Sequence, residues 1–192
     1  MALKGLAGMF MALLVTANTG GAFAEPPASG KGETTDAGKL GQALSLLHAV
    51  SQWSVKLSEM ADKRAKSDLV KTYARAIMNA NPTADAKLVS VAEKKGIEVA
   101  ALDPKTEAGK SLIDRMKAEA VLLGSLEGDA FDKEYMTLVT NTQQSVLNLL
   151  KASKASAKDP EVKQLLGELT TTIQNRLKTA QDIMLKIYGN QI

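Results

Sequence analysis

Four long segments of this chain carry apolar residues at intervals of three and four positions, which is the period of an α-helix that buries one face. The segments begin near residues 39, 67, 129 and 159. The last segment has the cleanest pattern, because Val162, Leu165, Leu169 and Ile173 all fall on one stripe. The pattern predicts an all-α fold in which four long helices pack side by side as an up-and-down bundle.

Each of the four segments places one polar residue near its midpoint, on the stripe where the helical period calls for an apolar one. These residues are Ser54, Asn81, Thr142 and Arg176. The midpoints of bundle helices share a layer, so we expect the four side chains to meet at the centre of the bundle. Bundles that hold cofactors build their sites in such a layer, but these four residues offer no imidazole and no carboxylate.

Proline, glycine and charged residues mark the expected ends of the helices. Lys94, Lys95 and Gly96 predict the end of the second long helix, since basic residues followed by glycine are a common C-terminal signal. Ser67 is expected to cap the start of that helix with its hydroxyl. Pro82 lies inside the same helix, so we expect a kink over residues 78–82.

A shorter helix is predicted between the second and third long ones. Asp103 and Pro104 supply a cap and a proline for its first position, and it should end near Leu123, before the glycines at 124 and 128. Asp159, followed by a proline, predicts the start of the last long helix in the same way.

The first 24 residues have the features of a secretory signal peptide. Lys4 precedes an apolar run over residues 6–15, and small residues lead to Ala22-Phe23-Ala24. The run is shorter than the roughly 20 apolar residues that a membrane-spanning helix needs. We therefore expect residues 1–24 to be removed, residues 25–38 to form a flexible linker, and residues 39–192 to form one helical domain. Export from a bacterial cell, to the periplasm or outside, is the natural interpretation.

Composition narrows the classes of partner. The chain has 24 basic and 21 acidic residues, a net charge of +3, and no run of lysine or arginine, so nucleic acid is not an expected partner. It has no cysteine, which excludes disulfides and a lipid-modified thiol. No transmembrane span is expected after removal of the signal peptide, and an envelope or secreted protein is a possible partner.

Several local motifs resemble a family of bacterial secreted proteins called domain of unknown function 4142. The segments VKTYARAIMNANPTADAKLVSVAEKKGIEV and FDKEYMTLVTNTQQSVLNLLKASKASAKDPEVKQLLGEL carry the resemblance. Its most diagnostic elements are the Lys94-Lys95-Gly96 end, Phe131-Asp132 with Tyr135, and the start at Asp159. The resemblance implies a ferritin-like four-helix bundle with a short extra helix between the second and third long helices.

The resemblance also indicates where this chain departs from the family. The positions that would carry an Asp-His pair in the second helix are Ala80 and Asn81, and the corresponding pair in the third long helix is Thr142 and Gln143. Arg176 stands where the resemblance implies a histidine, and Ser54 where it implies a glutamate. Neither amide, hydroxyl nor guanidinium groups replace imidazole or carboxylate as transition-metal ligands, so we expect no cofactor and no metal at this layer.

Other candidate residues have simple structural explanations. His48 is the sole histidine and has no carboxylate near it in the sequence, so a packed or partly solvated imidazole is the preferred interpretation. Glu127, Asp129 and Asp132 lack the spacing of a calcium loop and are expected to cap helices. Arg176 is expected at the edge of the core, the alternative being a buried cation bonded to Asn81, Thr142 or Gln143.

Three functions remain open from the sequence. The first is a non-catalytic exported bundle that acts by contact, for which the uncharged stretch over residues 135–150 offers Asn141, Gln144 and Asn148 on its outer side. The second is a metal or redox protein with atypical ligands, namely His48, Glu59 and Asp62. The third is a carrier of a small apolar ligand beside the kink at Pro82.

Overall fold

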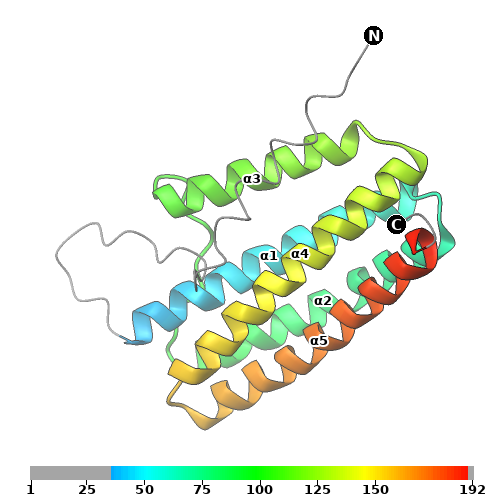
Figure 1. Ribbon diagram of the computed structural model, residues 1–192. Helices are drawn as coiled ribbons and strands as arrows, with labels where there is room; N and C mark the ends of the chain where they lie inside the picture. Colours follow the sequence, from blue (N-terminus) through cyan, green and yellow to red (C-terminus); the bar gives the residue numbers. More distant parts are fainter. Residues whose placement is uncertain (1–35, 190–192) are drawn as a thin grey trace, which may run out of the picture. The chain divides into compact units, whose positions relative to one another are not determined.

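The computed structural model describes residues 36–189, and these residues form five α-helices and no strands (Figure 1). In chain order the helices are α1 (Asp36–Arg64), α2 (Asp68–Lys94), α3 (Glu107–Gly124), α4 (Gly128–Ser156) and α5 (Pro160–Tyr188). The predicted signal peptide and residues 25–35 of the predicted linker lie outside the described part of the chain. Residues 36–38 were predicted as linker, but they form the first residues of α1.

The four long helices form the predicted bundle. α1 and α5 each pack against both α2 and α4, so the four helices close a ring around one core (Figure 1). The shorter α3 lies between the second and third long helices in the sequence, as predicted, and packs against α4 outside the ring. The all-α fold class is therefore confirmed.

The buried apolar side chains gather in two clusters, one near each end of the bundle. The cluster that we call the Asp132 end includes Ala61, Val70, Phe131, Tyr135 and Ile183. The cluster that we call the Asp159 end includes Leu44, Leu88, Leu150, Val162 and Leu166. Because α2 ends in the second cluster and α4 starts in the first, α3 carries the chain back between them, and each long helix is antiparallel to both of its neighbours in the ring.

At the Asp132 end, the buried carboxylate of Asp132 holds the connection between α1 and α2. Asp132 is 1% exposed, and its two oxygens accept hydrogen bonds from the backbone N–H groups of Lys66 at 2.9 Å and Ser67 at 2.7 Å. We predicted that the Ser67 hydroxyl caps α2, and this is wrong: Ser67 is the N-cap residue, but its side chain makes no capping bond. Asp132 of α4 holds the chain here instead. This contact could not be predicted, because Asp132 lies far from Ser67 in the sequence.

The predicted signals for the end of α2 and the start of α5 are confirmed. Gly96 adopts a φ of 65°, and the N–H of Ile97 donates to the carbonyl of Ala92 at 2.9 Å, which is the bond that closes a Schellman motif. At the start of α5, Asp159 accepts from the N–H groups of Glu161 and Val162 at 2.9 and 3.1 Å. Both helix ends use the local chemistry that the sequence indicated.

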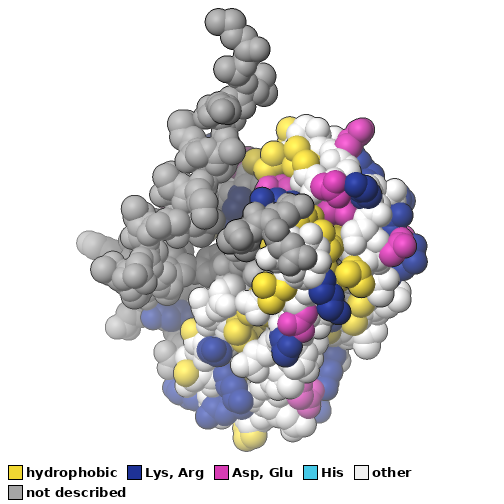
Figure 2. All heavy atoms as spheres, turned by 45° about the vertical axis from the view of Figure 1, so that its right-hand side comes forward, with side chains coloured by type: hydrophobic (Ala, Val, Ile, Leu, Met, Phe, Trp, Pro, Cys, Tyr) yellow, Lys and Arg dark blue, Asp and Glu magenta, His cyan; other side chains and the backbone are white. Residues whose placement is uncertain are grey.

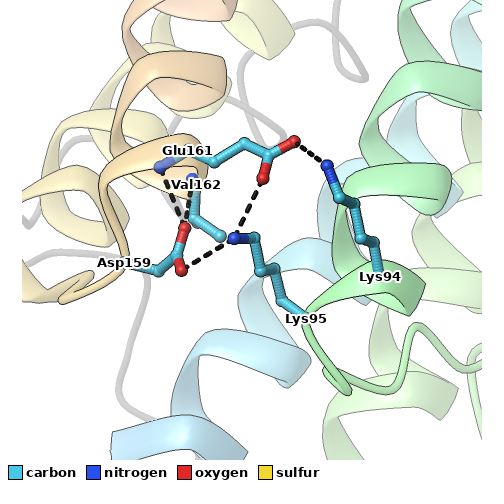
Figure 3. A network of polar contacts seen from close by, with 5 residues as sticks. All are labelled: Lys94, Lys95, Asp159, Glu161 and Val162. Atoms are coloured by element: carbon cyan, nitrogen blue, oxygen red, sulfur yellow. Dashed lines mark hydrogen bonds and ion pairs between the residues drawn. The ribbon is translucent and has the colours of Figure 1, made fainter.

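A network of charges links these two helix ends (Figure 3). Lys95 contacts Asp159 at 3.0 Å and Glu161 at 2.9 Å, and Lys94 contacts Glu161 at 2.9 Å. The lysines lower the pKa of both carboxyl groups, chiefly through the hydrogen bonds from Lys95. The network therefore joins the C-terminus of α2 to the N-terminus of α5 at the Asp159 end.

Two other predicted helix details need correction or qualification. α3 begins at Glu107 rather than at Pro104, because the Asp103 carboxylate accepts from the N–H of Lys105 at 2.8 Å and so forms a turn before the helix. Thr106 is the actual cap and accepts from the N–H of Gly109 at 3.1 Å. α2 continues through Pro82 as one helix.

On the face drawn in Figure 2, apolar, basic and acidic side chains are interspersed. Among the residues that the structure describes, the large apolar ones that remain exposed are Leu69, Val121, Leu122 and Leu185. Across residues 36–189, we find no helix whose length and apolar character would let it cross a membrane.

Candidate functional site at the centre of the bundle

The structure brings all five predicted central residues to the wall of one cavity. The cavity has a volume of about 80 Å³ and lies between the four long helices. Its wall includes Ser54 from α1, Asn81 from α2, Thr142 and Gln143 from α4, and Arg176 from α5. Most other side chains in the wall are aliphatic, among them Leu47, Leu88, Val139 and Ile173.

Arg176 and Asn81 form one polar pair in this wall. Arg176 is half-buried, and its Nη1 donates a hydrogen bond to Oδ1 of Asn81. Asn81 is 7% exposed and donates through Nδ2 to the carbonyl of Ser51 at 3.3 Å. Arg176 is half-buried, which fits the edge position that we preferred over a buried cation. It is also bonded to Asn81, whose oxygen offsets part of the cost of desolvation. Burial still lowers the pKa of Arg176.

Gln143 and Tyr73 form a second polar pair. Gln143 donates through Nε2 to the hydroxyl of Tyr73, and that hydroxyl lies 3.5 Å from the carbonyl oxygen of Arg176. Burial raises the pKa of Tyr73 to about 12, so the phenol is neutral at physiological pH. Tyr73 was not singled out from the sequence, because its hydroxyl leaves no signal in the helical period.

The two hydroxyl residues contribute differently. Ser54 donates to the carbonyl of Val50 at 2.8 Å within its own helix, so its hydroxyl hydrogen is already used. Thr142 is half-buried in the cavity wall. The five predicted residues and Tyr73 offer amides, hydroxyls, a neutral phenol and a guanidinium, none of which is a good transition-metal ligand or a general base at neutral pH.

His48 lies outside this layer and has a carboxylate partner. Its Nδ1 is 2.8 Å from Oδ1 of Asp85, and its Nε2 is 3.0 Å from Nε2 of Gln52. The imidazole is partly solvated, as we preferred. It nevertheless has a carboxylate beside it, because Asp85 lies 37 positions away on α2 and reaches His48 across the α1–α2 contact. Asp85 also contributes to the wall of the central cavity.

His48 contributes to a second cavity, between α1 and α3. This cavity has a volume of about 210 Å³, and its wall includes His48 and Trp53 of α1, Met116 of α3, and Leu102 of the preceding loop. Trp53 donates through Nε1 to Glu119 at 2.8 Å, which anchors α3 to α1 beside the cavity. We call this cavity the α1–α3 pocket.

The alternative ligands predicted for a metal site do not converge. His48 and Glu59 are eleven positions apart on α1, or about 16 Å along a helix that rises 1.5 Å per residue. Asp62 pairs with Arg75 at 2.5 Å, and Glu59 is exposed. In the part of the chain that the structure describes, no three histidine or acidic side chains come together as a metal cluster would require.

The acidic residues near the start of α4 serve the structure in two ways. Asp132 holds the start of α2, as described above, and Asp129 pairs with Lys66 at 2.9 Å on the surface. Glu127 is the N-cap residue of α4, but its side chain makes no capping bond. Of the three, Asp132 comes nearest to the predicted capping role, but it binds the two residues that precede α2 and not the first turn of a helix.

The model of the family described as domain of unknown function (DUF4142) matches residues 24–183 of this chain. The chain belongs to the DUF4142 family. No curated protein sequence matches it significantly.

Solved structures of CopM are similar in fold to this DUF4142 protein. The matches cover 78% of this chain and 97–98% of CopM, at 15–16% identity and TM-scores of 0.60–0.61. CopM was solved in an apo form, an Ag-bound form and a Cu(I)-bound form. At this identity the comparison supports a shared helical fold.

Proposed function

We propose that this protein is a non-catalytic binding protein, exported by a bacterium, that acts by contact with another protein of the cell envelope. The observation that carries the proposal is the chemistry of the central layer. Its amides, hydroxyls, neutral phenol and guanidinium have neither the basicity nor the ligand character that proton transfer or redox catalysis requires. Among the described residues, the one carboxylate in the cavity wall, that of Asp85, is paired with His48. Export rests on the signal-peptide features of residues 1–24.

The outer face of α4 is the surface that we propose for this contact. Asn141, Gln144 and Asn148 are exposed along it, and Gln144 donates to Asn148 at 3.3 Å. No charged residue occurs between Glu134 and Lys151. A face without charge is suited to an interface, because the buried centres of interfaces are depleted of charged residues. We call this surface the α4 face.

Site-specific photocrosslinking in cells tests this contact. The photoreactive residue p-benzoylphenylalanine replaces Gln144 on the α4 face, and a matched control carries it at Thr171, an exposed position of α5. We expect one discrete crosslinked species from the Gln144 position and none from the Thr171 position. A second substitution, Asn148→Lys, should abolish that species. Identical patterns from both positions, or no crosslink from either, would contradict the proposal.

A second candidate function is binding of a soft monovalent metal ion, and the α1–α3 pocket favours it. His48 and Met116 supply an imidazole and a thioether to one cavity, and both are ligand types that such ions accept. The contact between Asp85 and Nδ1 of His48 resembles the carboxylate support that metal-bound histidines commonly have. CopM has been solved with Ag and with Cu(I) bound, and we propose the same class of metal ion for this candidate.

Competition with a chromophoric Cu(I) chelator under anaerobic conditions tests the second candidate. We expect one Cu(I) per chain, with affinity reduced at least about tenfold by His48→Ala and by Met116→Leu, since each removes one ligand. Met60→Leu is the matched control, because Met60 packs against the Asp132 end instead. The candidate fails if Cu(I) stays with the chelator or if the three variants bind alike.

A further inference from the structure

The central cavity contains a positive charge, that of Arg176, that makes no ion pair with the described residues. Arg176 is half-buried, and its side-chain partner among the described residues is the neutral amide of Asn81. No ion pair reaches it from any residue between 36 and 189, whereas Arg75 and Arg115 each pair with a carboxylate. The carboxylate of Asp85 lies in the cavity wall but is paired with His48. A partly desolvated cation in this setting is stabilised by an anion that enters the cavity.

Gln143 adds a second polar group to the same wall. It is 7% exposed, and its Oε1 receives no hydrogen bond from the described residues, while its Nε2 is bonded to Tyr73. Rotation of the amide by half a turn exchanges its two ends, so that Tyr73 donates to Oε1 and the NH₂ group points to the cavity. Gln143 can therefore offer a ligand either an acceptor or a donor.

Size and wall composition restrict what could bind. The cavity volume of about 80 Å³ is close to half of the roughly 150 Å³ of an apolar cavity that takes up benzene, so the ligand must be smaller than benzene, with fewer than six heavy atoms. Aliphatic side chains such as Val139 and Ile173 make up most of the remaining wall. These surfaces favour a ligand with one charged group and a short apolar end.

We propose that the central cavity binds a short-chain monocarboxylate. Its carboxylate accepts hydrogen bonds from Arg176, with Gln143 as a second donor after rotation of its amide, and its alkyl end packs against the aliphatic wall. This site lies inside the bundle and is independent of the contact proposed for the α4 face. It also differs in charge from a metal site, because a fixed guanidinium repels a metal cation.

Asp85 provides a specific check on this proposal. It lies in the same wall, one helical turn after Asn81, and its carboxylate is held by His48. The negative charge of Asp85 opposes a bound carboxylate, so Asp85→Asn should strengthen binding, whereas most substitutions in a binding site weaken it. Asparagine keeps the oxygen that faces Nδ1 of His48, so the substitution changes the charge with little change in shape.

Backbone chemical-shift titration by NMR with propionate, at constant ionic strength, tests the site. Propionamide is the control ligand, because it has the same shape without the charge. We expect saturable shifts at Asn81 and Arg176 with propionate and at least about tenfold weaker binding of propionamide. Arg176→Gln should weaken propionate binding at least about tenfold, and Asp85→Asn should tighten it a few-fold.

Arg75→Gln is the matched control, because Arg75 is an exposed arginine that pairs with Asp62 away from the cavity. Its affinity for propionate should equal that of the unmodified protein. Equal binding of propionate and propionamide, no saturable shift with propionate, or weaker binding after Asp85→Asn would each overturn the proposal. If Arg176→Gln fails to fold, the two ligands and the Asp85→Asn variant still decide the question.

Discussion

At the Asp132 end, the buried polar side chains have partners, whereas the central layer leaves one without. Asp132 accepts two backbone hydrogen bonds, and the Tyr135 and Ser58 hydroxyls are bonded to each other at 2.9 Å. In the central layer, the Oε1 of Gln143 has no donor among residues 36–189, and the Arg176 cation faces a neutral amide. Among residues 36–189, Ser153 near the end of α4 is the other buried side chain with an atom that has no partner. The comparison indicates that the polar groups at the Asp132 end stabilise the fold, whereas the central layer keeps polar atoms that are available to a ligand.

Removal of the Asp132 carboxylate should have the largest effect on stability. Asp132→Ala leaves the N–H groups of Lys66 and Ser67 without their acceptor, so the free energy of unfolding should fall by about 2–4 kcal/mol. Urea denaturation measures the change. Asp129→Ala is the control, because Asp129 is exposed and its pair with Lys66 should contribute less than about 1 kcal/mol. If the two variants lost similar free energies of unfolding, the buried and the exposed carboxylate would contribute alike, which would contradict this prediction.

Alkaline pH should destabilise the protein through the Tyr73 phenol in the central layer. The pKa of Tyr73 in the folded state is about 12, above the ordinary value of about 10. Folding therefore favours the neutral phenol over the phenolate. The stability that this group contributes is present below pH 10 and is lost as the pH rises towards 12, by about 2 kcal/mol. Tyr73→Phe should show a smaller loss over that range in urea denaturation. Parallel curves for the two proteins would contradict burial of the phenol.

Loss of the Tyr135 hydroxyl should have a moderate effect at the Asp132 end. Tyr135→Phe leaves the Ser58 hydroxyl without its partner in a fully buried position, so we expect a loss of about 1 kcal/mol. Tyr188→Phe is the matched control, because the Tyr188 hydroxyl makes an exposed bond at 3.3 Å and should contribute less than about 0.5 kcal/mol. Thermal denaturation is sensitive enough to separate the two variants.

Replacement of Arg176 should have the smallest effect on stability. Arg176→Leu removes a partly desolvated charge and adds apolar contact, while Asn81 loses one bond, so the free energy of unfolding should change by less than about 1 kcal/mol. The same urea experiment as for Asp132→Ala provides the comparison. Breaking a buried charged pair costs about 3 kcal/mol or more. A loss of that size would show that the central layer supports the fold as strongly as the Asp132 end does.

Local patterns predicted most of the fold. Helical periodicity placed the four long helices, and proline and glycine signals placed α3. The chemistry of Asp159 and Gly96 predicted two helix ends, because such signals act over a few residues. The periodicity also selected Ser54, Asn81, Thr142 and Arg176, whose side chains all reach one cavity. The midpoints of bundle helices lie at the same height. The position of each residue along its own helix was therefore enough to predict that the four side chains meet.

Contacts between distant parts of the sequence could not be predicted in the same way. Asp85 reaches His48 across 37 positions, and Asp132 reaches the start of α2 across 65 and 66 positions. Tyr73 has the same periodic position as a core residue, and its polar role depends on where Gln143 lies in three dimensions. Each of these residues is distinguished by its neighbours in space, which depend on helix packing.

Diffraction from crystals soaked with Ag⁺ tests most directly the claim that the central layer is not a metal site. Anomalous scattering locates silver without assumptions about its ligands. We predict no silver in the cavity between Asn81, Thr142, Gln143 and Arg176, and any bound ion should lie in the α1–α3 pocket beside His48 and Met116. An ordered silver ion in the central cavity would contradict the account.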